Sequence, residues 1–272
     1  MIAILLSTYN GEKYLVDQLE SLFRQTYKEF ILHIRDDGSN DGTLEILKKY
    51  KEKHSNIVIY SENSKKNIGA SLSFMWLLEN VDSKYYMFCD QDDIWFPNKI
   101  QLCLDSILSE EKRTTNKAIL IHTDLIVVDN GLNIISSSLW ENNKINPFKI
   151  GTKYLKVINY VTGCTIIINK LARDISITKN KEILMHDYWV ALCVDAEGGK
   201  IVNLPLPTIF YRQHENNVVG AIKSKLKYPI LNRYFHIPDV EYSKKLFFMI
   251  RNIYRISFIE YLFLRITYYL KY

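Results

Sequence analysis

Four short apolar runs recur in the first ninety residues, and each of them ends in a polar loop. They are "IAILLS" (2–7), "FILHIR" (30–35), "NIVIYS" (56–61) and "YYMFC" (85–89). Continuous apolar runs of this length are typical of strands buried on both faces of a parallel sheet. Leu15, Leu19 and Leu22 then follow the first loop at helical spacing. The repeated strand–loop–helix order predicts an α/β fold with a Rossmann-like, mostly parallel sheet, flanking helices and right-handed crossovers.

The polar loops after these strands are where we expect a ligand site. Ligands of doubly wound sheets bind beyond the carboxyl ends of the strands. The loops at 7–12, 36–43, 62–70 and 90–95 all follow predicted strands, so they should meet at one edge. Further along, "VTGCTIIINK" predicts a strand, "HDYWVALCV" (186–194) the start of a helix, and "YRQH" (211–214) the end of a strand, whereas 136–147 indicates a mobile connection.

The composition limits the class of protein. A chain of 272 residues with 47% hydrophobic content can build one large core, or a core with an appendage. The four cysteines are far apart without a CxxC pair, which excludes a zinc knuckle or disulfide framework and fits a reducing compartment. The opening "MIAILLSTYNGEKY" has no basic leader or cleavage site, so we expect a buried strand there, not a signal peptide.

Positive charge is concentrated in the last fifty residues. Residues 221–272 carry ten Lys and Arg against three Asp and Glu, so the net charge of +5 leaves the preceding 220 residues slightly negative. Such a distribution argues against nucleic acid as a partner of the whole chain. We therefore divide the chain into a folded domain at 1–220 and a basic, aromatic helical tail at 221–272.

The tail contains an apolar stretch at 246–270 that is long enough to span a membrane, but charged residues interrupt it. If the stretch is one helix, Lys244, Arg251, Arg255 and Arg265 share one face. This pattern predicts an amphipathic helix on an anionic membrane surface. The alternative is a helix that packs on the rest of the chain or on a second subunit, with its cations outward.

Three carboxylates lie within four residues in "CDQDDIW" (89–95), directly after a predicted strand. An unpaired carboxylate is costly to bury. If the strand continues, Asp90 and Asp92 point to the same side. Two such carboxylates suit a divalent cation with oxygen ligands, Mg²⁺ or Mn²⁺, which leaves coordination positions for a diphosphate. The alternative is a solvated acidic turn.

A second acidic pair, Asp36 and Asp37, follows the second strand in "DDGS". A carboxylate there can accept hydrogen bonds from a nucleotide base or ribose. Equally, the pair can form an Asx turn that caps the next helix. The sequence has neither GxGxxG nor GxxxxGK[ST], so neutralising a phosphate would fall to a metal.

Four motifs occur in order at the expected distances: "LLSTYNGEKYLVDQLESLFRQTY", "IRDDGSNDGT", "NIGASLSF" and "FCDQDDIWFPNK". Together they resemble the donor-binding half of the family 2 inverting glycosyltransferases, which have the GT-A fold. "DQDDIW" and "YRQH" are most similar to the bacterial rhamnosyltransferase-like branch. The resemblance is strong over 2–125 and moderate over 155–220. It implies a nucleotide-sugar-binding half at 1–125 and an acceptor half at 126–220.

The resemblance implies roles for individual residues. Nucleotide-sugar binding falls to Ser7, Thr8, Tyr9, Asn10, Glu12, Asp37, Asn67, Asp90, Gly163 and Arg212, with Gly163 near the sugar and Arg212 on a phosphate. The metal, Mn²⁺ or Mg²⁺, falls to Asp90, Asp92, Asp93 and His214. Asp187 in "MHDYW" is the expected general base, although an Asp before an apolar helical run is also typical of an N-cap. The family often has an acidic pair here, whereas His186 precedes Asp187 in this chain.

The expected activity is metal-dependent, inverting transfer of a sugar from a nucleotide-diphosphate donor to a saccharide or lipid-linked saccharide in surface polysaccharide synthesis. The motifs favour dTDP-rhamnose, and a UDP-hexose (galactose, glucose or N-acetylglucosamine) is the alternative. We expect a cytoplasmic protein, peripheral on the inner face of the cell membrane. A nucleotidyltransferase is disfavoured because "STYNGEKY" lacks a glycine-rich basic loop, and a non-catalytic membrane-docking protein because the acidic residues are intact.

Overall fold

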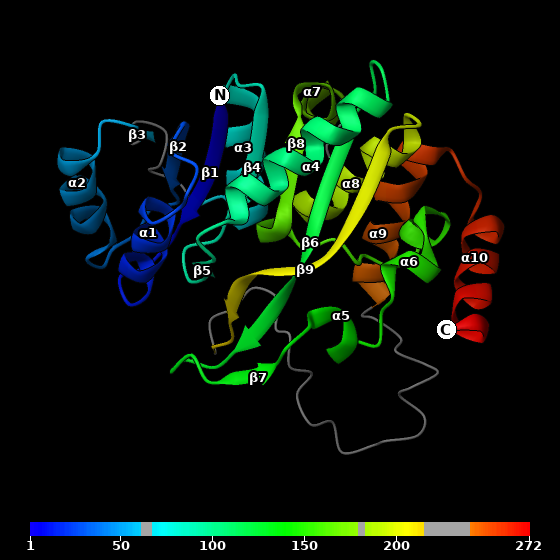
Figure 1. Ribbon diagram of the computed structural model, residues 1–272. Coiled ribbons are helices and arrows are strands. Elements are labelled where there is room, and N and C mark those ends of the chain that lie inside the picture. Colours follow the sequence, from blue (N-terminus) through cyan, green and yellow to red (C-terminus); the bar gives the residue numbers. More distant parts are fainter. Residues whose placement is uncertain (61–66, 179–182, 215–239) are drawn as a thin grey trace.

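A computed structural model of the chain describes residues 1–60, 67–178, 183–214 and 240–272 (Figure 1). The strands are β1 (Ile2–Thr8), β2 (Phe30–Asp36), β3 (Ile57–Tyr60), β4 (Tyr85–Cys89), β5 (Ile94–Trp95), β6 (Ile119–Val128), β7 (Ile134–Ser136), β8 (Ile166–Asn169) and β9 (Lys200–Arg212). The helices are α1 (Leu15–Phe23), α2 (Thr43–Lys53), α3 (Ala70–Asn80), α4 (Lys99–Arg113), α5 (Leu139–Asn142), α6 (Pro147–Ile150), α7 (Lys170–Thr178), α8 (His186–Ala196), α9 (Val240–Tyr254) and α10 (Phe258–Lys271). Two short 3-10 turns, η1 (Thr152–Lys156) and η2 (Gly163–Thr165), precede β8.

One sheet runs through the molecule in the order β3-β2-β1-β4-β8-β6-β9-β5, with β7 on the edge of β6. The four strands predicted first form a parallel block, β3-β2-β1-β4. Antiparallel β8 then joins this block to the parallel pair β6 and β9. The carboxyl ends of β1, β2 and β4 therefore meet at one edge, as predicted.

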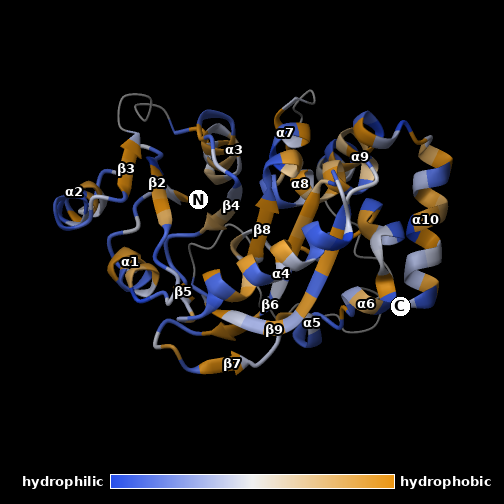
Figure 2. Ribbon diagram, turned by 45° about the horizontal axis from the view of Figure 1, so that its top comes forward, coloured by the Kyte–Doolittle hydropathy of each residue, from blue (hydrophilic) through white to orange (hydrophobic). Residues whose placement is uncertain are grey.

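Both faces of the sheet are buried, because successive side chains of a strand point to opposite faces. In β1, Ala3 and Leu5 pack with α3, α7 and α8, whereas Ile2, Ile4 and Leu6 pack with α1, α2 and α4. The hydrophobic residues concentrate along the central strands in Figure 2. The continuous apolar runs of the sequence thus form the middle layer of an α/β sandwich.

The polar stretch at 136–147 is structured, so the expectation of a mobile connection there is wrong. The Asp124 carboxylate accepts hydrogen bonds from the Ser138 hydroxyl and the Leu139 backbone N–H. Ser138 in turn caps α5. Trp140 is buried against this turn. A buried carboxylate from a distant strand organises the stretch, which local sequence pattern does not reveal.

The apolar stretch at 246–270 forms two helices, so the prediction of one continuous amphipathic helix is wrong. Arg255 adopts a left-handed backbone with φ 55°. Ser257 then starts α10 with a capping box, in which its side chain accepts from the Glu260 N–H and the Glu260 carboxylate accepts from the Ser257 N–H. The cations on either side of this break do not lie along one helix. Residues 221–239 of the predicted tail lie outside the described residues.

The first tail helix, α9, packs on the rest of the chain, which was the alternative to a helix on the membrane surface. Leu246, Met249 and Ile250 of α9 are buried in the same core as α8. The Tyr254 hydroxyl donates to the Asp195 carboxylate at 2.7 Å. Across the described ranges, no helix combines the length and apolar character that crossing a membrane requires.

Candidate active site

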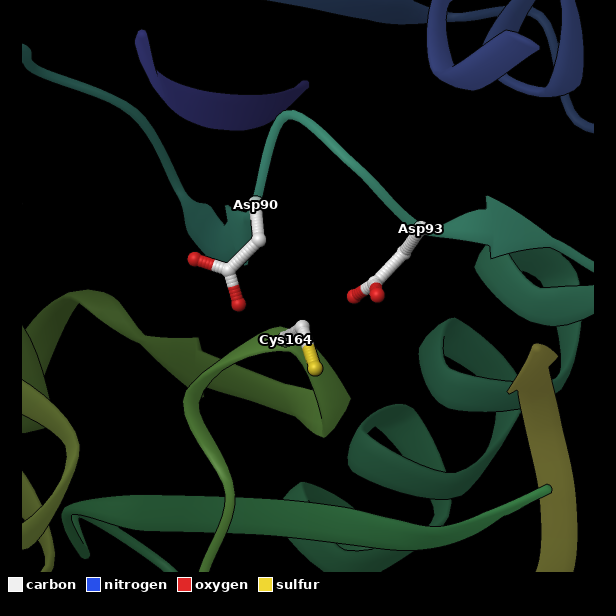
Figure 3. Close-up of side chains that lie close together, drawn as sticks. All are labelled: Asp90, Asp93 and Cys164. Carbon is white, nitrogen blue, oxygen red and sulfur yellow. The ribbon is translucent and has the colours of Figure 1, made fainter. Parts of the chain in front are cut away.

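The acidic loop follows β4, but the strand ends at Cys89 and residues 90–93 turn. Strand alternation therefore does not extend to Asp92, and the expected pairing of Asp90 with Asp92 on one side of a strand is not formed. Instead the turn brings Asp90 and Asp93 together against Cys164 of η2 (Figure 3), with one ligand atom of each within 4.8 Å of the others. The carboxylate that lies beside Asp90 is therefore that of Asp93, three residues later in the chain.

Electrostatics at this cluster favour a bound cation. Burial, followed by the Asp92 and Asp187 carboxylates, raises the pKa of Asp90 to about 7. Burial also raises the pKa of Asp93 well above its usual range, and that of the Cys164 thiol. The Asp93 Oδ2 atom is buried without a hydrogen-bond partner in the described part of the chain. The carboxylate oxygens of Asp90 and Asp93 are hard ligands, which fit Mn²⁺ or Mg²⁺.

Asp92 faces another predicted ligand, His214. Its Oδ2 lies 2.7 Å from His214 Nε2, and both side chains are mostly buried. The imidazole packs against the Tyr14 ring, with 4.8 Å between the ring centroids. The structure thus brings together, at the end of β9, a carboxylate and a histidine that are separated by 122 positions.

Arg212 holds the backbone of the acidic loop next to Asp92. Its guanidinium donates to the Asp92 carbonyl at 3.0 Å, to the Asn130 carbonyl at 3.0 Å and to the Asp17 carboxylate at 2.9 Å. The group also stacks over the Tyr14 ring. Arg212 is 3% exposed and does not line the main cleft. The guanidinium N–H groups of Arg212 hold the acidic loop in place. This role differs from the direct contact with a phosphate that the sequence analysis expected.

Gln91, between the first two acids, joins the acidic loop to the loop after β1. Its side-chain oxygen accepts from the Tyr9 N–H at 2.8 Å, and its side-chain nitrogen donates to the Tyr9 carbonyl at 3.0 Å. A Cβ at Gly11 would overlap the Gln91 amide, which explains the glycine there. The sequence analysis assigned no role to Gln91.

Three residues predicted to bind the nucleotide sugar instead connect the first loop to the second. The Thr8 hydroxyl donates to Asp36, the Asn10 side chain accepts from the Asn40 N–H, and Glu12 accepts from the Gly42 N–H. Asp36 also accepts from the Gly38 and Ser39 N–H groups, which forms the Asx turn of the alternative. This turn does not cap the next helix, because α2 begins at Thr43 with Gly42 as its N-cap. These contacts fix the edge on which Ser7 and Tyr9 face the cleft.

Asp37 lies in the cleft with its carboxylate engaged. It pairs with Arg35 at 2.5 Å and accepts from the Ile68 and Gly69 N–H groups at 3.0 and 2.7 Å. Asp37 thereby positions the start of α3, beside Asn67. The neighbouring residues 61–66 lie outside the described ranges.

Asp187 is the second residue of α8, and the N-cap is Met185, so the N-cap alternative is wrong. The Asp187 carboxylate accepts from the Gly163 N–H at 3.0 Å and the Tyr188 N–H at 2.6 Å. Burial raises its pKa to about 6, so it is mostly ionised at neutral pH. A buried, oriented carboxylate with this pKa can act as a general base.

Many of these groups line one cleft of about 840 Å³. Of the residues predicted from sequence, it is lined by Ser7, Tyr9, Asp37, Asn67, Asp90, Asp92, Gly163 and Asp187. Asn10 and His214 line an adjoining hollow of about 490 Å³, together with Tyr9 and Gln91. Thr8, Glu12, Asp93 and Arg212 line neither. The cleft also contains Trp140, Tyr160 and His186, which sequence reasoning did not assign.

Lys99 is another residue that sequence reasoning missed. It is fully buried in α4, its ammonium donates to the Cys164 carbonyl at 2.9 Å, and it lies 4.5 Å from the centre of the Trp95 ring. A buried cation under η2 offsets the charge of the nearby acidic cluster. The only signal was a lysine in the buried first turn of an amphipathic helix.

Comparison with known proteins agrees with this geometry. The family model described as "Glycosyl transferase family 2" matches residues 3–176, a range that contains the acidic loop and ends before Asp187. The chain is 29% identical to the dTDP-rhamnosyl transferase RfbG of Shigella flexneri, over 82% of this chain and 76% of that protein. It is 27% identical to the UDP-Glc:alpha-D-GlcNAc-diphosphoundecaprenol beta-1,3-glucosyltransferase WfaP of Escherichia coli, over 80% of this chain and 79% of that protein.

Solved structures share the fold. S. aureus TarS 1-349 in complex with UDP-GlcNAc superposes with a TM-score of 0.57 at 20% identity, over 79% of this chain and 59% of that chain. The mannosyltransferase PcManGT from Pyrobaculum calidifontis, in complex with GDP-Man and Mn²⁺, superposes with a TM-score of 0.57 at 13% identity. The superposition covers 79% of this chain and 57% of that chain. The chain thus spans less than two thirds of these solved proteins. The likeness confirms the predicted GT-A architecture.

Proposed function

The chain belongs to glycosyl transferase family 2 and is a glycosyltransferase, and we propose that it transfers a sugar from a nucleotide-diphosphate donor with inversion at the anomeric carbon. The observation that carries the proposal is that the acidic loop and an ionisable Asp187 line one cleft. We favour dTDP-rhamnose as the donor, with a UDP-hexose as the alternative. Both readings have support, since RfbG is named a dTDP-rhamnosyl transferase and WfaP uses UDP-Glc by its name.

In this proposal Asp187 takes the proton of the acceptor hydroxyl while that oxygen attacks the anomeric carbon. The hydroxyl approaches from the face opposite the leaving diphosphate, which inverts the configuration. Two backbone N–H groups orient the carboxylate, and a pKa of about 6 keeps it mostly ionised at neutral pH.

Asp90, Asp92, Asp93 and His214 would hold Mn²⁺ or Mg²⁺. When bound, such a cation stabilises the charge on the departing nucleoside diphosphate. The chain's own contribution is to keep these ligands in place. Arg212 holds the carbonyl of Asp92, and Lys99 holds the carbonyl of Cys164 beneath the loop.

The nucleotide end of the donor lies, in our proposal, against the loops after β1 and β2. Ser7, Tyr9, Asp37 and Asn67 line the cleft there. Thr8, Asn10 and Glu12 act indirectly, because their side chains bind the second loop. Gly163 lines the same cleft, next to Asp187.

We further propose that α10 holds the protein on the cytoplasmic face of the membrane, beside a lipid-linked saccharide acceptor in surface polysaccharide synthesis. α10 lies at the outer edge of the molecule (Figure 2). Its exposed apolar side chains are Phe258, Ile259, Leu262, Phe263, Ile266, Tyr269 and Leu270. Arg265 and Lys271 on the same helix suit anionic headgroups. A second copy or another protein covering α10 is the alternative.

The test of the donor site is thermal unfolding of the purified chain with dTDP or UDP, each with and without Mn²⁺. A ligand that binds only the native state raises stability by RT ln(1 + [L]/Kd). We expect a metal-dependent rise that is larger for dTDP, and transfer of rhamnose from dTDP-rhamnose. A larger rise with UDP would move the donor to the hexoses. No rise with either nucleotide would refute the donor site.

A further inference from the structure

Two aromatic residues of the cleft have no part in the proposed donor site or in the base. Trp140 is in α5, Tyr160 lies between η1 and η2, and both line the cleft. Their ring centroids lie 5.5 and 5.8 Å from that of the same ring, the buried His122. The two side chains therefore form one aromatic wall of the cleft.

Each side chain of the aromatic wall presents a polar atom to the cleft. Trp140 and Tyr160 are only 9% and 5% exposed. Among the described residues, however, the Trp140 indole N–H and the Tyr160 hydroxyl have no hydrogen-bond partner, and neither atom is fully buried. Burial raises the pKa of Tyr160, so its hydroxyl keeps the proton at neutral pH. The wall thus offers two hydrogen-bonding groups to a molecule in the cleft.

The aromatic wall adjoins the proposed base. Asn159, directly before Tyr160, donates from its side chain to the Asp187 carboxylate at 3.5 Å. Asn159 also lines the cleft, as do the apolar residues Ile145 and Val161. The hydroxyl that Asp187 deprotonates belongs to the acceptor, so the sugar that carries this hydroxyl has to lie next to the carboxylate. The wall is placed where that sugar arrives.

The segment between the two aromatic residues packs against α10. The Tyr272 hydroxyl donates to the Lys149 carbonyl of α6 at 2.6 Å, and the Tyr268 ring of α10 lies 5.6 Å from the Tyr154 ring of η1. α6 and α10 are side by side in both views (Figures 1 and 2). The wall is therefore built on a segment that contacts the helix for which we propose membrane contact, as expected if the acceptor is lipid-linked.

We propose that Trp140 and Tyr160 form the acceptor subsite, in which the indole N–H and the phenol hydroxyl form hydrogen bonds with hydroxyl groups of a neutral pyranose. The inference rests on the proposed function and names the part of the cleft that holds the acceptor. Ile145 and Val161 offer apolar contact for the face of the sugar ring. The Asp187 carboxylate beside the wall repels an anionic sugar, which makes a neutral one the expected class.

The test is steady-state transfer by the full chain at saturating donor and Mn²⁺. The acceptor probes are the p-nitrophenyl glycosides of glucose, galactose, rhamnose and N-acetylglucosamine, and the donor is whichever of dTDP-rhamnose and UDP-glucose is turned over. Tyr160→Phe keeps the ring and removes the hydroxyl. We expect it to raise the KM of the acceptor about fivefold and to leave kcat within about twofold, as for loss of one hydrogen bond. Trp140→Phe removes the indole N–H and should have an effect of the same size.

Tyr154→Phe is the matched control, because it makes the same change in the same segment outside the cleft. It should leave the KM of the acceptor unchanged. By calorimetry in Mn²⁺, the dissociation constant of the nucleoside diphosphate should stay within about twofold of wild type in all three variants. Tyr160→Phe should also unfold at the wild-type temperature, since its hydroxyl has no partner among the described residues.

Four results would overturn the inference. An unchanged acceptor KM in Tyr160→Phe and Trp140→Phe would refute the subsite. Equal weakening of acceptor and nucleotide binding, with a lower unfolding temperature, would mean that both rings serve the fold. Hydrolysis of the donor without transfer to any of the glycosides would refute a neutral pyranose as the ligand. Absence of nucleotide binding by the wild-type chain would refute the proposed function as well, whereas the first three results refute only the subsite.

Discussion

Gly163→Ala tests how the site is built, because its effect follows from the contacts around Gly163 in the structure. A methyl group at Gly163 would lie 2.7 Å from His186 Nε2, 3.2 Å from His186 Cε1 and 3.5 Å from Asp187 Cβ. The imidazole cannot swing aside, since Phe74 and Phe88 hold both of its sides. The backbone of η2 must therefore move away from α8. That movement lengthens the 3.0 Å bond from the Gly163 N–H to the Asp187 carboxylate.

The loss of stability and of turnover follows from two contacts: the clash of the added methyl group with His186, and the weakened hydrogen bond from the Gly163 N–H to Asp187. An extra methyl group in a packed site costs about 1–3 kcal/mol. We expect about 2 kcal/mol of lost stability, which is about 4–8 °C in unfolding temperature for a chain of this size. Displacement of a catalytic group by an ångström lowers turnover roughly 100-fold. The N–H of Gly163 also lowers the pKa of Asp187, so weakening that bond should raise this pKa from its value of about 6.

Thermal unfolding and steady-state kinetics measure the two effects. The matched control is Gly199→Ala, whose added Cβ would meet the Ala118 and Val194 carbonyl oxygens at 2.6 and 2.7 Å outside the cleft. It should lower stability and leave the rate per folded molecule unchanged. In a His186→Ala background, Gly163→Ala should cost less than about 1 kcal/mol, because the clashing ring is gone. An unchanged unfolding temperature for Gly163→Ala, or an equal cost in both backgrounds, would refute the packing argument.

Four further outcomes are expected. Asp187→Asn should lower transfer by about 10² to 10⁴-fold and leave the dissociation constant of the donor within about twofold of wild type; equal loss of both would contradict the base assignment. The base must be ionised, and burial raises the pKa of Asp187 to about 6. The wild-type turnover number, measured at saturating metal and donor, should therefore fall about tenfold per pH unit below pH 6. A flat profile down to pH 5 would argue against this base. Gln91→Ala removes both hydrogen bonds to the Tyr9 backbone and should weaken nucleotide binding about tenfold by calorimetry, whereas an unchanged affinity would mean that the clamp is dispensable. Finally, Phe263 on α10 is 65% exposed, and Phe263→Ser should abolish co-sedimentation with anionic lipid vesicles. The unfolding temperature should stay unchanged. Undiminished sedimentation would favour a protein partner for α10.

The sheet and the site edge were predictable because their determinants are local. Each of the first four strands is a continuous apolar run, and a run of that kind needs burial on both faces wherever it lies in the chain. The loops after these strands must then share one edge, whatever their detailed geometry. Asp187 was identifiable as a candidate because its family motif is short and contiguous.

Other features depended on how distant segments meet. Strand alternation paired Asp90 with Asp92, but β4 ends before both, and the turn pairs Asp90 with Asp93 instead. Arg212 was expected on a phosphate, yet its donors meet groups up to 195 positions away. In the tail, a capping box after Arg255 outweighed the apolar periodicity and divided one predicted helix into two.

By itself, therefore, the sequence determined the family, the presence of a mostly parallel sheet and the edge at which the polar loops gather. These properties follow from residue periodicity and short contiguous motifs, which operate over a few positions. The tertiary structure alone decided which carboxylates share a buried cluster, that Gln91 clamps the Tyr9 backbone, and that the His186 ring packs between Phe74 and Phe88. The physical reason is that hydrogen bonding and desolvation are properties of a side chain's three-dimensional surroundings, and those surroundings are contributed by segments that no local pattern connects.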